Sequence, residues 1–245
     1  MKLRYIVAAI IVMIMIGIPI LRAAPTGPDT VSVLNNSRIN ASSAATVQAL
    51  AGNVTELNIN ANTVTRFWQG YYGNISGTIV LGNAGGVNLY QWAAANPQGE
   101  IYATKNSTPI NWTNVGCANE SQILNEDAWM GATVNNSDSA NHTFAKTNHP
   151  SFFTANTLIS GCRSTSVNGT GASDIFWEAL LVDNGTSSAD MTDDIFIYTT
   201  IIDQNRLGFD IKTHDFQMLV GEPGSGSEEW PNGNPTTYYF YVELE

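Results

Sequence analysis

The sequence has few of the residues on which most enzyme chemistry depends. Only 13% of its 245 residues are charged, two are cysteines and three are histidines, His142, His149 and His214. It contains no HExxH pair, Gly-x-Ser-x-Gly elbow, phosphate-binding loop, dinucleotide fingerprint or Cys-x-x-Cys-His haem site. These absences exclude the motif-defined metalloproteases, serine hydrolases, nucleotide-binding enzymes and haem proteins. We therefore predict that the protein is not an enzyme and has no catalytic residues.

The acidic residues do not form a recognisable catalytic set either. Adjacent pairs occur at Glu126–Asp127, Asp193–Asp194 and Glu228–Glu229. A glycosidase needs two carboxylates that face each other across a cleft, which neighbouring residues do not supply. We interpret the pairs as solvated acids. A Ser-His-Asp set that uses His214 and Asp215 can be drawn, but His214 is more simply the start of a strand.

One short acidic segment has the chemistry of a cation site. Asp190, Asp193 and Asp194 offer carboxylate oxygens, which are the ligands that calcium prefers. Their spacing is not that of an EF-hand loop. Calcium is thus the one metal that the sequence leaves open, and we expect no other cofactor.

Basic residues are scarce, ten against 21 acidic ones, so the formal net charge is −11. Loss of residues 1–24 removes three basic groups and brings the charge to −14. A field of this sign repels nucleic acid and anionic lipid. We therefore expect no nucleic-acid partner.

The N-terminus has the pattern of an export signal. Lys2 and Arg4 precede an uncharged apolar run, residues 5–21, and small residues follow it. We interpret residues 1–24 as a signal peptide that is cleaved or, alternatively, as an apolar helix retained as an anchor. Either alternative places the remainder outside the cell or on its surface. Membrane contact is expected only through this segment, if it is not cleaved.

Two features fit an extracellular protein. Cys117 and Cys162, the only cysteines, are predicted to form a disulfide. Sugar-acceptor sequons occur more often than we expect by chance, although a surface rich in Asn and Thr would also generate some of them. They lie at Asn35, Asn40, Asn53, Asn74, Asn106, Asn111, Asn119, Asn135, Asn141, Asn168 and Asn184.

Hydrophobic patterning predicts an all-β fold, an antiparallel two-layer sandwich over residues 53–245. Two short helices, residues 120–130 and 137–144, form an insertion between the cysteines. An extended polar arm, residues 25–52, precedes the sandwich and follows the N-terminal apolar helix. Strands are expected at residues 31–34, 54–61, 75–81, 87–92, 100–104, 157–160, 175–182, 195–202, 215–220 and 236–244.

The segment RFWQGYYGNISGTIVL (residues 66–81) is mainly a wall of the core in this interpretation. With unbroken alternation, Phe67 and Tyr71 point inward, as do Ile75, Ile79 and Leu81. Trp68 and Tyr72 share the outer face with Asn74 and are candidates for stacking on sugar rings. A bulge at Gly70 or Gly73 would reverse this phase.

Five stretches together resemble a group of exported archaeal β-rich cell-surface proteins. The resemblance covers residues 53–245 and carries over no catalytic residue. Some archaeal extracellular filaments are built from sandwich subunits joined by an N-terminal donor strand, and the arm is similar to that strand in placement. The stretches are RFWQGYYGNISGTIVL (66–81), GEIYA (99–103), HPSFF (149–153), HDFQMLV (214–220) and TTYYFYVELE (236–245).

These observations predict an exported, glycosylated structural or adhesive protein of the cell surface, such as a filament subunit. Val31, Val33 and Leu34 are the candidate anchors of an assembly strand, and the expected partners are further copies or other surface proteins. The alternative is a carbohydrate-binding module or surface receptor with a polysaccharide ligand.

Overall fold

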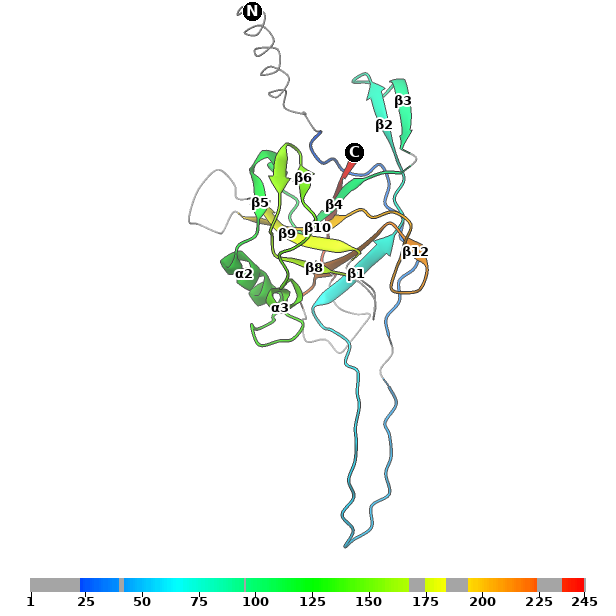
Figure 1. Cartoon of the computed structure of the whole chain (residues 1–245), viewed down its shortest axis with the longest axis vertical. Helices are drawn as coiled ribbons and strands as arrows, with labels where there is room; N and C mark the ends of the chain where they lie inside the picture. Colours follow the sequence, from blue (N-terminus) through cyan, green and yellow to red (C-terminus); the bar gives the residue numbers. More distant parts are fainter. Residues whose placement is uncertain are drawn as a thin grey trace, which may run out of the picture.

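The computed structural model describes residues 23–39, 42–94, 96–167, 175–183, 194–223 and 235–244, which fold into packed antiparallel sheets (Figure 1). The all-β prediction is thus confirmed. The predicted signal or anchor, residues 1–24, lies almost wholly outside the described residues. Among the residues that are described, no helix is long and apolar enough to cross a membrane.

A six-stranded antiparallel sheet forms the centre of the molecule. Its strands follow the spatial order β14–β4–β10–β9–β5, and β8 also pairs with β9. Their bounds are β4 (Gly99–Thr104), β5 (Val115–Cys117), β8 (Ser164–Ser166), β9 (Trp177–Asp183), β10 (Ile195–Ile201) and β14 (Tyr239–Leu244).

The central strands β4, β9 and β10 are buried along nearly their whole length. A strand covered on both faces needs apolar side chains at successive positions, and the run Ile195–Ile201 has them. One cluster of buried side chains, which includes Leu180, Tyr198 and Met218, packs on one face of the sheet. A second cluster, which includes Leu181 and Ile197, packs on the other face.

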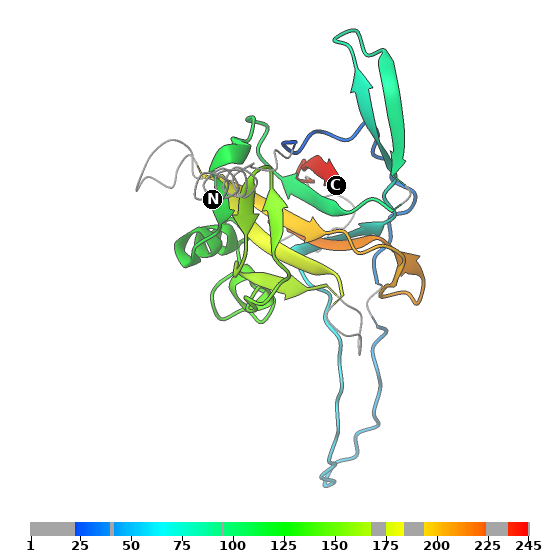
Figure 2. The same ribbon diagram turned by 45° about the horizontal axis from the view of Figure 1, so that its top comes forward.

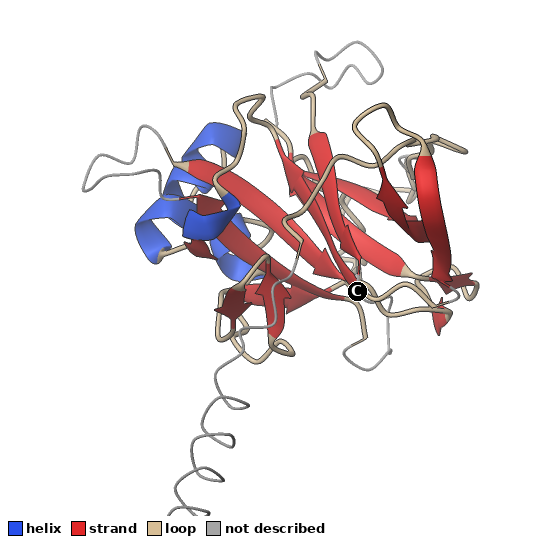
Figure 3. Cartoon of the chain, turned by 90° about the horizontal axis from the view of Figure 1, so that it is seen from above, coloured by secondary structure: helices blue, strands red, loops and turns tan. Residues whose placement is uncertain are grey.

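A smaller layer covers the first face of the central sheet. It consists of the antiparallel pair β1 (Trp68–Gly73) and β13 (Phe216–Gly221), with α2 (Glu120–Met130) and α3 (Ala140–Thr143) beside it. Figure 3 shows the two helices together at one side of the strands. The other face is covered by the hairpin of β6 (Phe152–Thr154) and β7 (Thr157–Ile159).

The helix predicted at residues 120–130 is confirmed, and its ends have local causes. The Asn119 side chain accepts a hydrogen bond from the Gln122 amide (3.0 Å), and the Gln122 side chain accepts one from the Asn119 amide (2.8 Å). This reciprocal capping box satisfies amides that the first helical turn leaves open. Gly131 ends the helix in the left-handed conformation, with φ of 76°.

The predicted disulfide is present between Cys117 at the end of β5 and Cys162, with Cα atoms 5.0 Å apart. Cys162 is buried in the second core cluster, and its amide donates to Nε2 of His149 (3.0 Å). Nδ1 of His149 lies 2.8 Å from the Pro150 carbonyl, which assigns the ring proton to Nδ1. The disulfide and the buried imidazole therefore form one structural unit.

Burial lowers the pKa of His149 below its ordinary value of 6.5, although the Pro150 carbonyl opposes this shift. The unfolded chain then binds a proton at a pH where the native imidazole stays neutral, so the contribution of His149 to stability is complete above pH 6.5 and is lost below it.

The variant His149→Gln retains an acceptor for the Cys162 amide but has no group that titrates. We expect its free energy of unfolding to fall less between pH 7.5 and pH 5 than that of the parent chain. Urea unfolding at both pH values measures this. His142→Gln, at an exposed position, should keep the full loss; equal losses in both variants would contradict the assignment.

Three smaller elements complete the fold. A 3-10 turn, η1 (Trp112–Asn114), precedes β5, and two hairpins lie outside the central layers. They are formed by β2 (Gly77–Gly82) with β3 (Asn88–Ala94) and by β11 (Arg206–Leu207) with β12 (Thr213–His214).

Candidate functional site

Two segments project from the body in opposite directions (Figures 1 and 2). The first, here called the long arm, comprises the described residues 27–39 and 42–66 and turns near Leu50–Asn53. It includes the predicted arm from residue 27 onward and continues through residues 53–66. The second is the β2–β3 hairpin. Both offer apolar side chains to solvent, which soluble single-domain proteins rarely do over large areas.

Between residues 29 and 66 of the long arm, every described residue except Val64 is exposed. The strand predicted at residues 54–61 is absent, although its alternating apolar residues Leu57 and Ile59 suit a strand. Residues 31–34 likewise pair with no described strand, and Val33 and Leu34 are 82% and 95% exposed. Thr26, the residue before the long arm, attaches the chain to the body. It exchanges two backbone hydrogen bonds with Val242 (3.0 and 2.8 Å).

The β2–β3 hairpin corrects a second prediction. Ile79 and Leu81 were expected to point into the core, but they are 47% and 52% exposed. Among the described residues, β2 pairs only with β3, and the hairpin extends beyond the central sheet (Figure 2). Tyr90 and Trp92 on β3 are exposed too, with their rings 4.6 Å apart. Asn74, as predicted, is exposed, and Ile75 is half-buried.

These exposed elements lie in a part of the sequence that is almost free of charge. Residues 67–99, which contain β1, the β2–β3 hairpin and their connections, have no charged side chain. From Ile39 to Gly99 only Glu56 and Arg66 are charged, and they cancel. The net charge of −11 therefore belongs to the rest of the chain. This run of uncharged residues is a sequence signal that the patterning argument missed.

β1 largely follows the predicted phase, without the bulge considered at Gly70 or Gly73. Phe67 is buried and Tyr71 packs on the same cluster. Trp68 departs from the predicted outer face, because its half-buried ring packs against the first core cluster near Tyr198 (6.2 Å) and its Nε1 donates to the Asp138 carbonyl (2.6 Å).

Tyr72 does face outward, as predicted, and belongs to an aromatic cluster at the β11–β12 hairpin. Its ring centroid lies 4.8 Å from those of Phe209 and His214. Ile211, at the tip of the hairpin, is exposed with a positive φ of 65°, a strained conformation for a β-branched residue. This cluster is the exposed surface that best fits a flat ring or an apolar partner.

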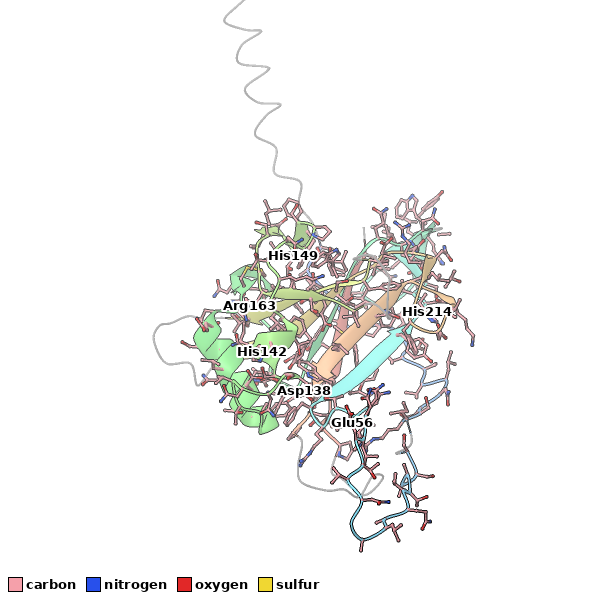
Figure 4. All side chains as sticks on the ribbon, turned by 60° about the horizontal axis from the view of Figure 1, so that its bottom comes forward. Glu56, Asp138, His142, His149, Arg163 and His214 are labelled. Carbon is pink, nitrogen blue, oxygen red and sulfur yellow. A yellow bond between two sulfur atoms is a disulfide. The ribbon has the colours of Figure 1, made fainter. Side chains whose placement is uncertain are left out.

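The histidines do not form a catalytic group. Figure 4 shows His142, His149 and His214 in separate parts of the molecule. Nε2 of His214 contacts Asp210 (2.7 Å), whereas the Asp215 carboxylate accepts hydrogen bonds from the amides of Ile75 and Asn205 (2.9 Å each). Asp215 thus connects loops and does not orient the imidazole. Desolvation would raise the pKa of Asp210, but hydrogen bonds from His214 and the Lys212 amide lower it.

A cleft of about 590 Å³ lies between β4, α2 and β10. Glu126 is buried beneath it and accepts hydrogen bonds from Lys105 and from the Tyr198 hydroxyl (3.0 Å). The Lys105 ammonium also lies 3.3 Å from the centre of the Trp129 ring. Burial lowers the pKa of Lys105 even though Glu126 opposes the shift. Lys105 and Glu126 therefore pair with each other inside the cleft.

The interpretation of Glu126 and Asp127 as solvated acids is wrong. Asp127 is 1% exposed, and its carboxylate accepts hydrogen bonds from the amides of Ala140 (2.5 Å) and Asn141 (3.2 Å). It therefore fixes the start of α3 against α2. The pair Glu228–Glu229 lies outside the described residues.

The predicted calcium ligands are mostly outside the described residues, since only Asp194 is described. Its carboxylate accepts a hydrogen bond from the Gln122 side chain (2.5 Å). No group of three or more potential metal ligands occurs within the described part of the chain.

The sequons that the structure describes lie mainly on the surface. Asn141 is half-buried and its side-chain oxygen accepts a hydrogen bond from Arg163 (2.5 Å); Asn106 is also half-buried. Asn40, Asn168 and Asn184 lie outside the described residues. The exposed positions are Asn35, Asn53, Asn74, Asn111, Asn119 and Asn135.

Comparison of the chain with protein-family models, with curated proteins and with solved structures finds no match. The function must therefore be argued from the exposed surfaces and the chemistry of the chain itself.

Proposed function

We propose that this protein is an exported, glycosylated structural or adhesive subunit of the cell surface that associates with further copies of itself, as in an extracellular filament. The observation that carries the proposal is the pair of apolar projections, the long arm and the β2–β3 hairpin, at opposite ends of one body. Two projections at opposite ends would contact different surfaces of neighbouring copies. Contacts of this kind between identical subunits generate rings or open filaments.

The disulfide and the surface positions of most described sequons support the extracellular part of the proposal. The charge distribution supports self-association through particular surfaces. Like-charged acidic parts of two copies repel each other, so copies are expected to meet through their uncharged segments. The long arm would supply the assembly strand. Val31, Val33 and Leu34 are exposed, and strand addition would bury them while it satisfies their backbone groups.

We expect the mature secreted chain to form oligomers at high protein concentration. Replacing Val31, Val33 and Leu34 by serine should weaken this association at least tenfold, because three apolar anchors are lost. The matched control replaces Val47 and Leu50, which are exposed on the same arm, and should retain association. Light scattering after size exclusion measures both. A mature chain that stays monomeric at all concentrations would overturn the proposal.

The second candidate is a carbohydrate-binding module, which the exposed rings of Tyr72 and Phe209, packed beside the buried His214, favour. Aromatic rings at a surface can stack on sugars, and Tyr72 has the required exposure. A polysaccharide ligand on an array that Tyr72→Ala abolishes would favour this function over assembly.

A further inference from the structure

β1 is an edge strand, and among the described residues only β13 pairs with it. The two strands pair in an unbroken antiparallel register. The Glu222 amide donates to the Phe67 carbonyl (2.8 Å), which makes Phe67–Glu222 a hydrogen-bonded pair. Because such pairs alternate with non-bonded ones, Gly70 and Tyr72 direct their N–H and C=O groups away from β13.

The far edge of β13 is closed, in contrast to that of β1. Three of its outward backbone groups are bonded to side chains on or next to the central sheet, which blocks the addition of a strand there. These bonds join the Leu219 amide to Glu178 (2.8 Å), the Gln217 carbonyl to Thr200 (2.9 Å) and the Gly221 carbonyl to Tyr238 (2.6 Å).

The outer edge of β1 also lacks the usual protections against pairing. Natural edge strands carry charges, prolines or bulges that prevent another strand from adding. β1 has no charge, no proline and no register shift, and Gln69, Gly70 and Tyr72 are exposed. On this edge, the described hydrogen bonds show only the Gln69 side chain, which donates to the Gly70 carbonyl (2.6 Å).

We propose that the outer edge of β1 receives residues 30–34 from the long arm of a second copy of this chain. This inference rests on the proposed self-association and names the surface that accepts the arm. The donor segment has an uncharged, β-prone sequence and is fully exposed in its own copy. Main-chain hydrogen bonds to Gly70 and Tyr72 would supply binding, as in other strand additions.

The side chains around this edge suit an apolar donor. Tyr72 and Phe209 form an exposed aromatic pair beside it, and Ile211 extends the same surface. Alternate residues of an added strand point to the same face, so Val31 and Val33 can contact this surface together. β1 and residues 30–34 carry no charged side chain, so their pairing brings no like charges of the two strands together.

Disulfide trapping tests the pairing, since neighbouring strands bring Cα atoms to about 4.5–5.5 Å, within disulfide range. The two cysteines of the chain are bonded to each other, so any new cross-link must come from the added thiols. Donor variants are Ser32→Cys and Val33→Cys, which cover both faces of the strand. The acceptor variant is Gln69→Cys, and Val80→Cys on the β2–β3 hairpin is the matched control.

We expect a disulfide dimer when a donor variant is mixed with Gln69→Cys, and none with Val80→Cys. A dimer with Val80→Cys alone would assign the arm to the hairpin and overturn this inference, while self-association stands. Oligomers without any trapped dimer at Gln69 would also overturn it. Monomers throughout would refute both the inference and the proposed function.

A proline on the edge gives an independent readout. Gly70→Pro removes an outward N–H that the β1–β13 ladder does not use, and a Cβ at Gly70 meets no atom closer than 4.0 Å. Association should weaken by about tenfold, the effect of one lost hydrogen bond of about 1.4 kcal/mol. Gly70→Ala keeps the N–H and should associate like the parent chain. Equal association of the proline variant, with an unchanged unfolding midpoint, would contradict the assignment.

Discussion

Replacing both cysteines, Cys117→Ala with Cys162→Ala, is expected to lower the free energy of unfolding by about 4 kcal/mol. The bridge joins residues 45 positions apart, and a cross-link of this span restricts the unfolded chain by about that amount in the loop-entropy model. The loop contains α2, α3 and the β6–β7 hairpin, so its loss affects both core clusters. Urea unfolding followed by circular dichroism measures the change.

Reduction of the unmodified protein provides the control for this prediction, because it removes the bridge without changing a side chain in the core. Dithiothreitol should lower the stability of the parent chain by a similar amount and leave the double variant unchanged. A loss below about 1 kcal/mol in both experiments would show that the bridge restricts the unfolded chain far less than the model requires.

Replacing the buried carboxylate, Glu126→Ala, is expected to cost about 3 kcal/mol, because it removes the partner of a partly buried ammonium. Lys105 would keep its contact with Trp129 but lose the carboxylate, and the Tyr198 hydroxyl would lose its acceptor. The same carboxylate raises the pKa of Lys105 against the larger effect of burial, so its removal should lower that pKa further. Denaturant unfolding at pH 7 measures the loss.

Two variants sharpen this prediction. Glu120→Ala, at an exposed position in the first turn of the same helix, should change stability by no more than about 0.5 kcal/mol. Lys105→Met combined with Glu126→Leu replaces the ion pair by apolar side chains and should recover most of the loss. Equal effects of the alanine variants at positions 120 and 126 would show that Glu126 is solvated after all.

Where burial and local chemistry agree, the sequence predicted the fold well. The Ile195–Ile201 strand is apolar at successive positions because both faces of the central sheet are covered. Asn119 and Gln122 specify the start of α2, and Gly131 specifies its end, each by a local contact or backbone conformation. The disulfide followed from cysteine count and the predicted compartment.

The errors have a common physical cause, because patterning shows which side chains avoid water but not what covers them. Ile79 and Leu81 have the apolar pattern of a strand, yet β3 is the one strand of the described structure that pairs with their strand, β2. Leu57 and Ile59 alternate like strand residues and lie exposed on the long arm.

Contacts between distant residues were beyond prediction for a different reason. Glu126 contacts Lys105, 21 positions earlier, and Tyr198, 72 positions later. Nothing at either position marks the partner, so patterning predicts a solvated acid. The inward position of the Trp68 ring could not be predicted for the same reason, because its Nε1 donates to the Asp138 carbonyl, 70 positions away.

Ionic strength should act in opposite ways on the two kinds of surface that this protein carries. Repulsion between the acidic parts of two copies reaches over about 30 Å at 0.01 M salt but only about 8 Å at 0.15 M. The uncharged span from Phe67 to Gly99 has no ion pairs that salt could screen. Contacts through that span should therefore strengthen as salt is added, whereas contacts built from ion pairs would weaken.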